Sequence, residues 1–240
     1  MEVTIRAAGK APPEVRLYLD GKGLRPSWDW NDVWQSEHAE AFTVAKAMSA
    51  DVLETLRDAV NKAIADGQTF REFSKRLPDV LAALGWWGEQ TMINPKTGEE
   101  KVVELGTPRR LATIYVMNGR VARAVGQWQR IQATKASRPW LIYELGPSAK
   151  HRAEHEAWAG AIRRVDDSIW DKLMPPNGWG CKCRVRQLND RQAEDKGGET
   201  IEPAPVTIES PGRDGEPVAH PKGVDPEWSY NPGAEPRRTS

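Results

Sequence analysis

The sequence has few of the residues that stabilise secreted or membrane proteins. Only two of its 240 residues are cysteine, and Cys181 and Cys183 stand one residue apart. That spacing suits neither the disulfide framework of a small secreted protein nor a disulfide that links distant parts of the chain. The N-terminus has no apolar segment of the signal-peptide kind, and no run of about 18 apolar residues predicts a membrane helix. We therefore expect a protein that is made and assembled in the cytoplasm, without a membrane partner.

Net charge and the common catalytic motifs are also missing. Lys and Arg together number 34 and so do Asp and Glu, so the total charge predicts neither a nucleic-acid nor a membrane partner. The sequence contains no Walker A, HExxH, GxSxG or GxGxxG pattern, which removes the best-known phosphate-binding, metalloprotease, hydrolase and dinucleotide signatures.

Tryptophan, in contrast, is abundant, with eleven residues against three phenylalanines. Large rings of this kind usually anchor a core or an interface. The alternative for the adjacent Trp86 and Trp87 is an assembly contact. The tryptophans to which the first interpretation applies are Trp28, Trp30, Trp34, Trp86 and Trp87.

Residues 1–88 have the apolar spacing of a helical region. Thr69 and Glu72 form a capping box, and Pro78 predicts a kink or a break in the helix that follows. Apolar side chains recur at helical spacing in three segments, which follow a short apolar stretch that ends at Gly21: Asp29 to Ala45, Ser49 to Gly67, and Thr69 to Gly85.

Residues 89–196 combine one long helix with short strands. A loop or small hairpin is expected over 88–107. Thr107 as N-cap and Pro108 in the first turn then begin a helix that runs to about residue 135. Strands are expected at 140–145 and 183–188, with a short helix at 151–158 between them.

The remaining residues, 197–240, contain eight prolines and six glycines and few large apolar side chains. Such a composition predicts an extended or disordered arm. The expected fold is therefore α+β and predominantly α-helical, with parts at 1–88, 89–196 and 197–240.

The densest group of possible metal ligands comprises His151, His155, Cys181 and Cys183. Histidines at positions i and i+4 would share one helix face, and the two cysteines could complete a tetrahedral zinc site. A Cys-x-Cys pair is shorter than the usual zinc knuckle, however. The competing interpretation is metal-free packing, in which the cysteines pin the strand at 183–188 against the helix that carries His155. We favour packing without a metal.

A catalytic Cys–His pair is a further hypothesis, with Cys181 as nucleophile and His155 as base. Such a pair needs an orienting side chain, and Asp166, Asp167 and Asn177 are candidates by sequence proximity alone. Nothing in the spacing selects one of them. We therefore predict no catalytic residue and do not expect an enzyme.

A basic stretch between Pro108 and Arg152 could contact DNA through phosphates alone, without sequence selectivity. The alternative is a solvated helix face. The candidate residues are Arg109, Arg110, Arg120, Arg123 and Arg130.

The segment RAEHEAWAGAIRRVDDSIWDKLMPPNGWGCKCRVR, residues 152–186, resembles the C-terminal signature of the phage Mu F-like minor head proteins. Residues 18–48, the GWWG at 85–88 and the WSYNPG at 228–233 are similar to the Mu-like branch of the same family. His151 falls outside the pattern, so the resemblance supports the other three ligands better. The matching positions are Arg152, His155, Gly160, Asp166, Asp167, Trp170, Pro175, Pro176, Asn177, Gly178, Trp179, Cys181, Cys183 and Arg184.

The resemblance implies a minor head protein of a tailed phage or prophage that acts in procapsid assembly and DNA packaging. It implies the portal and the capsid or scaffold proteins as partners, a location inside the procapsid or virion near the portal, and sequence-independent contact with DNA. Two alternatives stay open: a zinc-dependent nucleic-acid-binding module, and a toxin or transferase-type enzyme, for which we expect too little chain after the signature.

Overall fold

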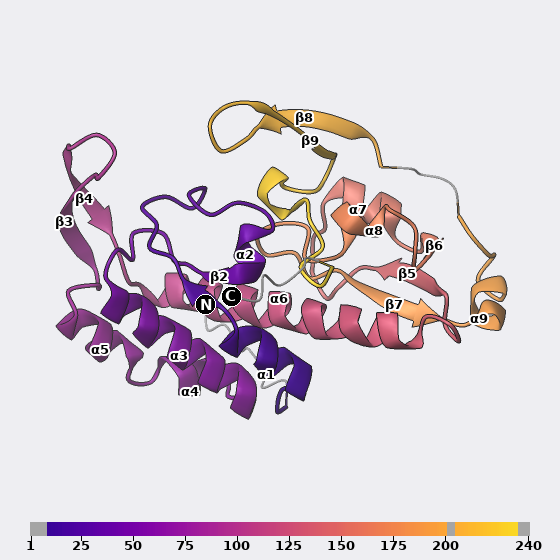
Figure 1. The fold of residues 1–240 in the computed structure, drawn as a ribbon, viewed down its shortest axis with the longest axis horizontal. Coiled ribbons are helices and arrows are strands. Elements are labelled where there is room, and N and C mark those ends of the chain that lie inside the picture. Colours follow the sequence, from indigo (N-terminus) through magenta and orange to yellow (C-terminus); the bar gives the residue numbers. More distant parts are fainter. Residues whose placement is uncertain (1–8, 201–204, 235–240) are drawn as a thin grey trace. The chain divides into compact units, whose positions relative to one another are not determined.

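Helices and small sheets alternate along the chain in the computed structural model, which describes residues 9–200 and 205–234 (Figure 1). This confirms the predicted α+β class. The chain divides into two compact units, Met1–Val33 with Glu40–Ala122, and Trp34–Ala39 with Arg123–Ser240. The division falls inside the long helix α6 (Pro108–Thr134) and not at the predicted boundaries, since composition cannot mark a boundary within one helix. None of the helices in the described part of the chain has the length and apolar character needed to cross a bilayer.

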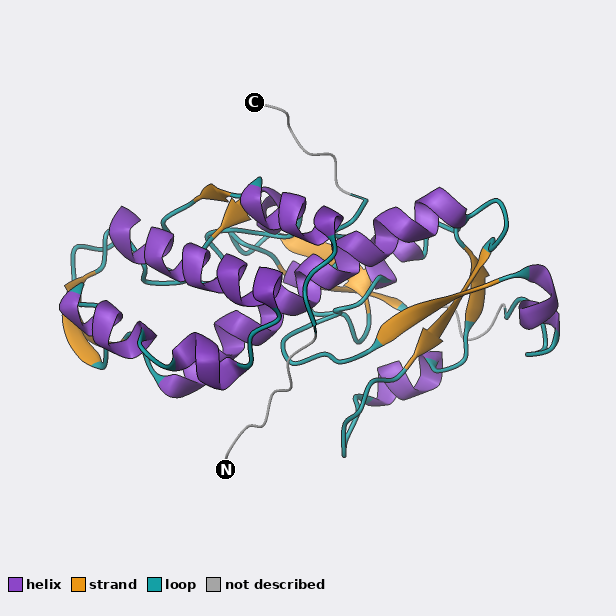
Figure 2. Cartoon of the chain, turned by 90° about the horizontal axis from the view of Figure 1, so that it is seen from below, coloured by secondary structure: helices purple, strands orange, loops and turns teal. Residues whose placement is uncertain are grey.

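The N-terminal unit is mostly helical (Figure 2). Its central helix is α3 (Ala50–Asp66), which packs against α1 (Pro13–Asp20), α4 (Phe70–Ser74) and α5 (Leu77–Ala83). The apolar stripe of α3 forms the middle of the core, as its spacing predicts. The buried side chains of this stripe are Val52, Leu53, Leu56, Val60 and Ile64.

Local sequence signals set the helix ends in this unit. Gly67 ends α3 in the left-handed region, with φ of 68°. The predicted capping box begins α4, with both the Thr69 side chain and the Glu72 carboxylate bonded to backbone N–H groups. Pro78 lies in the first turn of α5, so the predicted break between α4 and α5 is confirmed.

The helix predicted from Asp29 to Ala45 is wrong. The segment contains only the short α2 (Glu37–Glu40) and β2 (Ala41–Phe42), which pairs in parallel with β1 (Gly23–Leu24). Asp32 Oδ2 accepts hydrogen bonds from the backbone N–H groups of Trp28 and Asp29, at 2.7 and 2.8 Å. Carboxylates that bond nearby backbone in this way stabilise turns at the expense of a helix, even where the apolar spacing is helical.

A β-hairpin occupies the segment for which the sequence predicts a loop or a hairpin. β3 (Glu89–Ile93) pairs antiparallel with β4 (Glu100–Glu104). The next helix, α6, begins as its sequence predicts, because Thr107 Oγ1 accepts the backbone N–H of Arg110 at 3.2 Å.

The C-terminal unit contains a three-stranded antiparallel sheet. β5 (Trp140–Glu144) lies between β6 (Ile162–Arg164) and β7 (Arg184–Leu188), which confirms both predicted strands. The C-terminal half of α6 runs beside the sheet (Figure 1), and Gln127 Nε2 donates to the Val185 carbonyl at 2.7 Å. Apart from the short α2, the other helices of this unit are α7 (Ala153–Trp158), α8 (Trp170–Leu173) and α9 (Asp190–Glu194).

Residues 205–234, called the C-terminal segment below, are structured where composition predicts an arm. β8 (Thr207–Pro211) and β9 (Pro217–Pro221) form a hairpin, followed by a 3-10 turn, η1 (Pro226–Trp228). Trp228 and Tyr230 are buried. Two large rings at the right positions anchor a segment whose average composition is poor in apolar residues. Residues 201–204 and 235–240 of the expected arm lie outside the described residues.

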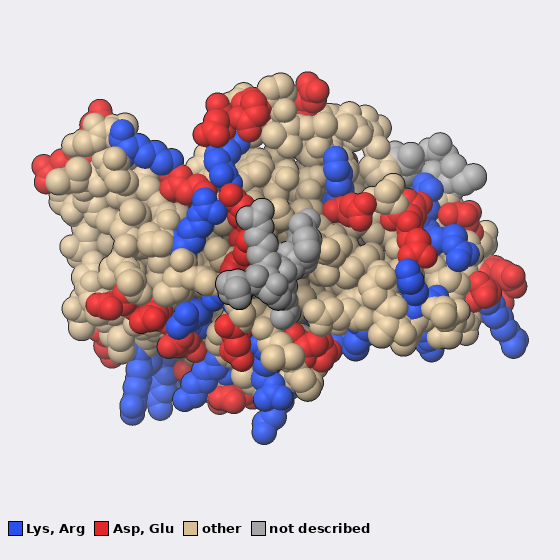
Figure 3. All heavy atoms as spheres, in the orientation of Figure 1, with Lys and Arg blue, Asp and Glu red and all other residues tan. Residues whose placement is uncertain are grey.

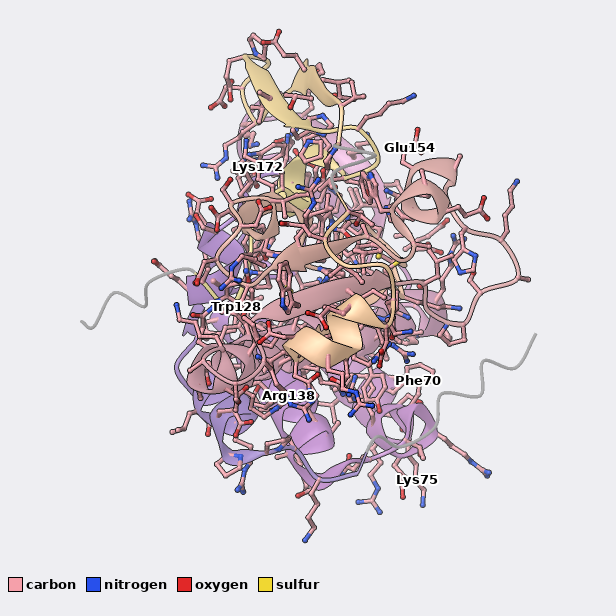
Figure 4. All side chains as sticks on the ribbon, turned by 90° about the vertical axis from the view of Figure 1, so that its right-hand side faces the viewer. Phe70, Lys75, Trp128, Arg138, Glu154 and Lys172 are labelled. Atoms are coloured by element: carbon pink, nitrogen blue, oxygen red, sulfur yellow. The ribbon has the colours of Figure 1, made fainter. Side chains whose placement is uncertain are left out.

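Polar contacts also tie the C-terminal segment to the rest of its unit. Lys172 Nζ donates to the Ala219 carbonyl at 3.4 Å, and Lys222 Nζ lies 3.4 Å from Glu154 Oε1. Gly233 lies directly against the ring of Trp128, on α6. Figure 4 labels Glu154, Lys172 and Trp128, the anchoring residues on α7, α8 and α6.

Candidate functional site

One histidine and two cysteines converge in the C-terminal unit. His155 lies on α7, while Cys181 and Cys183 lie in the turn that precedes β7. Their ligand atoms all lie within 4.8 Å of one another, and Cys183 Sγ is 3.5 Å from His155 Nδ1. His155 and Cys181 are buried and Cys183 is half-buried. We call these three residues the His–Cys cluster.

The orientation of the His155 ring follows from its other nitrogen. Nε2 lies 2.9 Å from the carbonyl oxygen of Gly223. A carbonyl can only accept, so Nε2 carries the proton and the lone pair of Nδ1 faces the cysteine sulfurs. The ring also stacks on Trp158, with centroids 5.3 Å apart and an interplanar angle of 24°. The histidine is therefore held in one tautomer and one orientation.

Glycines allow the turn that carries the cysteines to form. The Cys181 N–H donates to the Gly178 carbonyl at 3.1 Å, and Gly180 has a φ of 76°. A Cβ on Gly178 would collide with the side chains of Asp225 and Arg152. Both glycines are thus required, one for close approach and the other for left-handed backbone.

The C-terminal segment closes the cluster through an ion pair. Arg152 bonds Asp225 in a bidentate manner, at 2.7 and 3.0 Å, and also donates to the Gly223 carbonyl at 3.2 Å. Asp225 Oδ2 accepts the N–H of Trp179 at 3.2 Å, which joins the ion pair to the cysteine turn. The Asp225 hydrogen bond raises the pKa of Arg152. This clamp fixes the carbonyl that orients His155.

The two thiols have divergent acidities. Hydrogen bonding with Cys181 lowers the pKa of the Cys183 thiol, the contacts with His155 and Tyr143 lower it further, and burial opposes these effects. The bond to Cys183, together with burial, raises the pKa of Cys181. Tyr143 donates to Asn177 Oδ1 at 2.9 Å, and burial raises its pKa. The cluster thus places a readily formed thiolate beside an imidazole.

The predicted orienting residues of a catalytic pair do not meet His155. Asp166 pairs with Lys135 at 2.8 Å, and Asp167 accepts the Ile169 N–H at 2.9 Å. Asn177 bonds Tyr143. The partner of His155 Nε2 is instead the backbone carbonyl of Gly223, which sequence proximity could not identify.

His151 does not join the cluster. α7 begins at Ala153 with Arg152 as N-cap, so His151 precedes the helix and cannot share a helix face with His155. Its Nε2 lies 2.8 Å from the Gly146 carbonyl. The i, i+4 argument is therefore wrong for this pair, because the helix starts two residues after His151.

The family model of Phage Mu protein F like proteins matches residues 54–186, more than half of the chain and all of the His–Cys cluster. The chain belongs to this family. The resemblance found in the sequence is thereby confirmed.

Two relatives of the Mu F-like family illustrate the match. The "Putative capsid assembly protein F" of Escherichia phage Mu is 39% identical over 191 residues, which cover 80% of this chain and 43% of the relative. The "Mu-like prophage FluMu F protein" of Haemophilus influenzae is 40% identical over 171 residues, 71% of this chain and 40% of the relative. The chain thus spans about two fifths of the length of the curated relatives it matches. No solved structure matches it.

The basic residues of this Mu F-like chain differ in their surroundings. Arg109, Arg123 and Arg130 are exposed. Arg110 is half-buried, and its guanidinium bonds the carbonyls of three other residues and lies 4.9 Å from the centroid of the Trp86 ring. Arg120 is half-buried, 4.0 Å from Met117 Sδ. Lys and Arg are interspersed with Asp and Glu over the face shown in Figure 3.

The adjacent Trp86 and Trp87 of the N-terminal unit are both at least half-buried. Trp86 is buried and donates from Nε1 to the Lys46 carbonyl at 3.0 Å, while Trp87 is half-buried. The core-anchor interpretation therefore fits Trp86. Trp30, in contrast, is 53% exposed.

Proposed function

We propose that this chain acts in assembly of the phage head, as a minor head protein that binds the portal of the procapsid from inside. The observation that carries the proposal is the 39% identity, over 80% of this chain, to a relative named for capsid assembly. An identity of 39% over that length indicates a common fold for the matched region. Capsid or scaffold proteins are further partners in this proposal.

A docking role agrees with the apolar side chains that the N-terminal unit exposes. Ile93 and Val102, on the β3–β4 hairpin, are 68% and 62% exposed. Val102 pairs with Thr91, two residues from Ile93, so both aliphatic side chains lie on one face of the hairpin. We assign this face to contact with a head protein.

Mixing the purified chain with the portal protein of the same phage should give a complex that elutes as one species in gel filtration at micromolar concentrations. Ile93→Lys with Val102→Lys should weaken the complex, because two charges would have to be desolvated at the contact. Val206→Lys, a matched change of an exposed aliphatic residue in the other unit, should leave it intact. Separate elution of the two folded proteins would contradict the proposed partner.

DNA contact is the second element of the proposed role, and Arg123 and Arg130 on α6 carry it. They are seven residues apart on one helix and both are exposed, so their guanidinium groups project to one side. Contacts of this kind read phosphates and not bases.

Arg123→Ala with Arg130→Ala should weaken binding to all DNA duplexes alike. The slope of log affinity against log salt should fall by about 0.9 for each phosphate that the variant no longer neutralises. Arg71→Ala with Lys75→Ala removes the same charge from exposed positions of the N-terminal unit and should have little effect. Equal losses in both double variants, or binding that salt does not weaken, would contradict this assignment.

A further inference from the structure

We propose that the His–Cys cluster is a zinc site, with His155 Nδ1, Cys181 Sγ and Cys183 Sγ as protein ligands and water as the fourth. The proposal goes beyond a role in head assembly. It also departs from the metal-free packing that the sequence favours. The reasons are the geometry of the three donor atoms and the groups that hold them.

The donor atoms have the separation that a tetrahedral ion requires. Zinc–sulfur bonds of about 2.3 Å and zinc–nitrogen bonds of about 2.0–2.1 Å at tetrahedral angles place sulfur and nitrogen about 3.6 Å apart. Cys183 Sγ and His155 Nδ1 are 3.5 Å apart. Because all three donors lie within 4.8 Å of one another, small side-chain rotations bring the set around one ion. Within the described residues, no further His, Cys, Asp or Glu joins this group.

The chemistry of the donors suits zinc. Two thiolates and one imidazole are soft and borderline ligands, which select zinc over magnesium or calcium. When the hydrated ion binds, two Zn–S bonds and one Zn–N bond replace bonds from zinc to water, one water stays as the fourth ligand, and the protons of the two thiols leave to solvent. The two thiolates neutralise the charge of the ion, so a buried site acquires no net charge. Neither oxidation nor reduction takes place.

The surroundings of His155 provide a second, independent indication. Metal-bound histidines almost always donate their other ring N–H to a carboxylate, carbonyl or water, which directs the free nitrogen at the ion. His155 does so through Nε2 to the Gly223 carbonyl. That carbonyl is in turn held by the Arg152–Asp225 pair. The C-terminal segment is therefore the outer shell of the proposed site.

The test begins with the full chain, purified from cells grown without added metal. Elemental analysis should find about one zinc per chain. Cobalt(II) exchanged into the protein should show the intense visible bands of a tetrahedral ion and the near-ultraviolet bands of thiolate ligation. Cys181→Ser, Cys183→Ser and His155→Ala should each lose the ion. His151→Ala changes the other histidine of the same stretch and should keep it.

The cysteine variants could fail to fold, so a variant that keeps every ligand is also needed. Asp225→Ala releases the Gly223 carbonyl but leaves the three donors, and should weaken zinc affinity by about 10–100-fold in competition with a chelator dye. Less than a tenth of an equivalent of metal in folded protein, before and after incubation with zinc, would overturn the site. So would equal metal loss in His151→Ala, or alkylation of Cys183 at the same rate with zinc and with chelator.

Discussion

Trp228→Ala should lower the free energy of unfolding of the C-terminal unit by about 3–5 kcal/mol, as for other buried tryptophans. Trp228 is 8% exposed and meets the Trp179 ring edge to face, with centroids 5.3 Å apart. Its loss would open a cavity and loosen the C-terminal segment, in which Trp228 and Tyr230 are the large buried rings. Urea unfolding followed by circular dichroism measures the change.

Val206→Ala is the control for this variant. Val206 lies in the same segment but is 65% exposed, so its truncation should change stability by less than about 0.5 kcal/mol. If Trp228→Ala behaved like Val206→Ala, the segment would not be packed, and the arm predicted from composition would be the better description.

Trp170→Ala should have a comparable effect, also about 3–5 kcal/mol. The Trp170 side chain is 1% exposed and donates from Nε1 to the Arg164 carbonyl at 2.8 Å. Its removal leaves a cavity, and the Arg164 carbonyl loses the indole donor while it keeps the N–H of Asp167. Trp170→Phe keeps most of the ring volume and should cost clearly less.

The matched control here is Trp30→Ala, because Trp30 is 53% exposed. Thermal unfolding of Trp170→Ala, Trp170→Phe and Trp30→Ala, measured in parallel, ranks their losses of stability. A loss in Trp30→Ala as large as that in Trp170→Ala would show that burial does not govern these positions.

Signals that act over a few residues predicted the fold well. Thr69 with Glu72 and Thr107 with Pro108 each start a helix where expected, since a cap and its N–H partners lie within three residues. The same local physics explains the failed helix between residues 29 and 45. There the Asp32 carboxylate bonds two preceding N–H groups, and a count of apolar spacing does not register this competition.

The candidate site could be predicted only in part. His155 and the two cysteines stood out as the chain's densest group of soft ligands, and the family pattern includes all three. Gly223 and Asp225 were missed because they lie 68 and 73 residues from their partners His155 and Arg152. Such contacts depend on how the C-terminal segment folds back against His155 and Arg152. The composition predicted a disordered arm for that segment.

We propose that this Mu F-like chain acts in head assembly, and loss of the chain shows whether it does. A stop codon early in its coding region should leave portal and coat proteins accumulating while DNA-filled heads fall sharply in electron micrographs of sedimented lysates. The unchanged chain supplied from a plasmid should restore them. Heads of normal number, size and DNA content without this chain would contradict the claim.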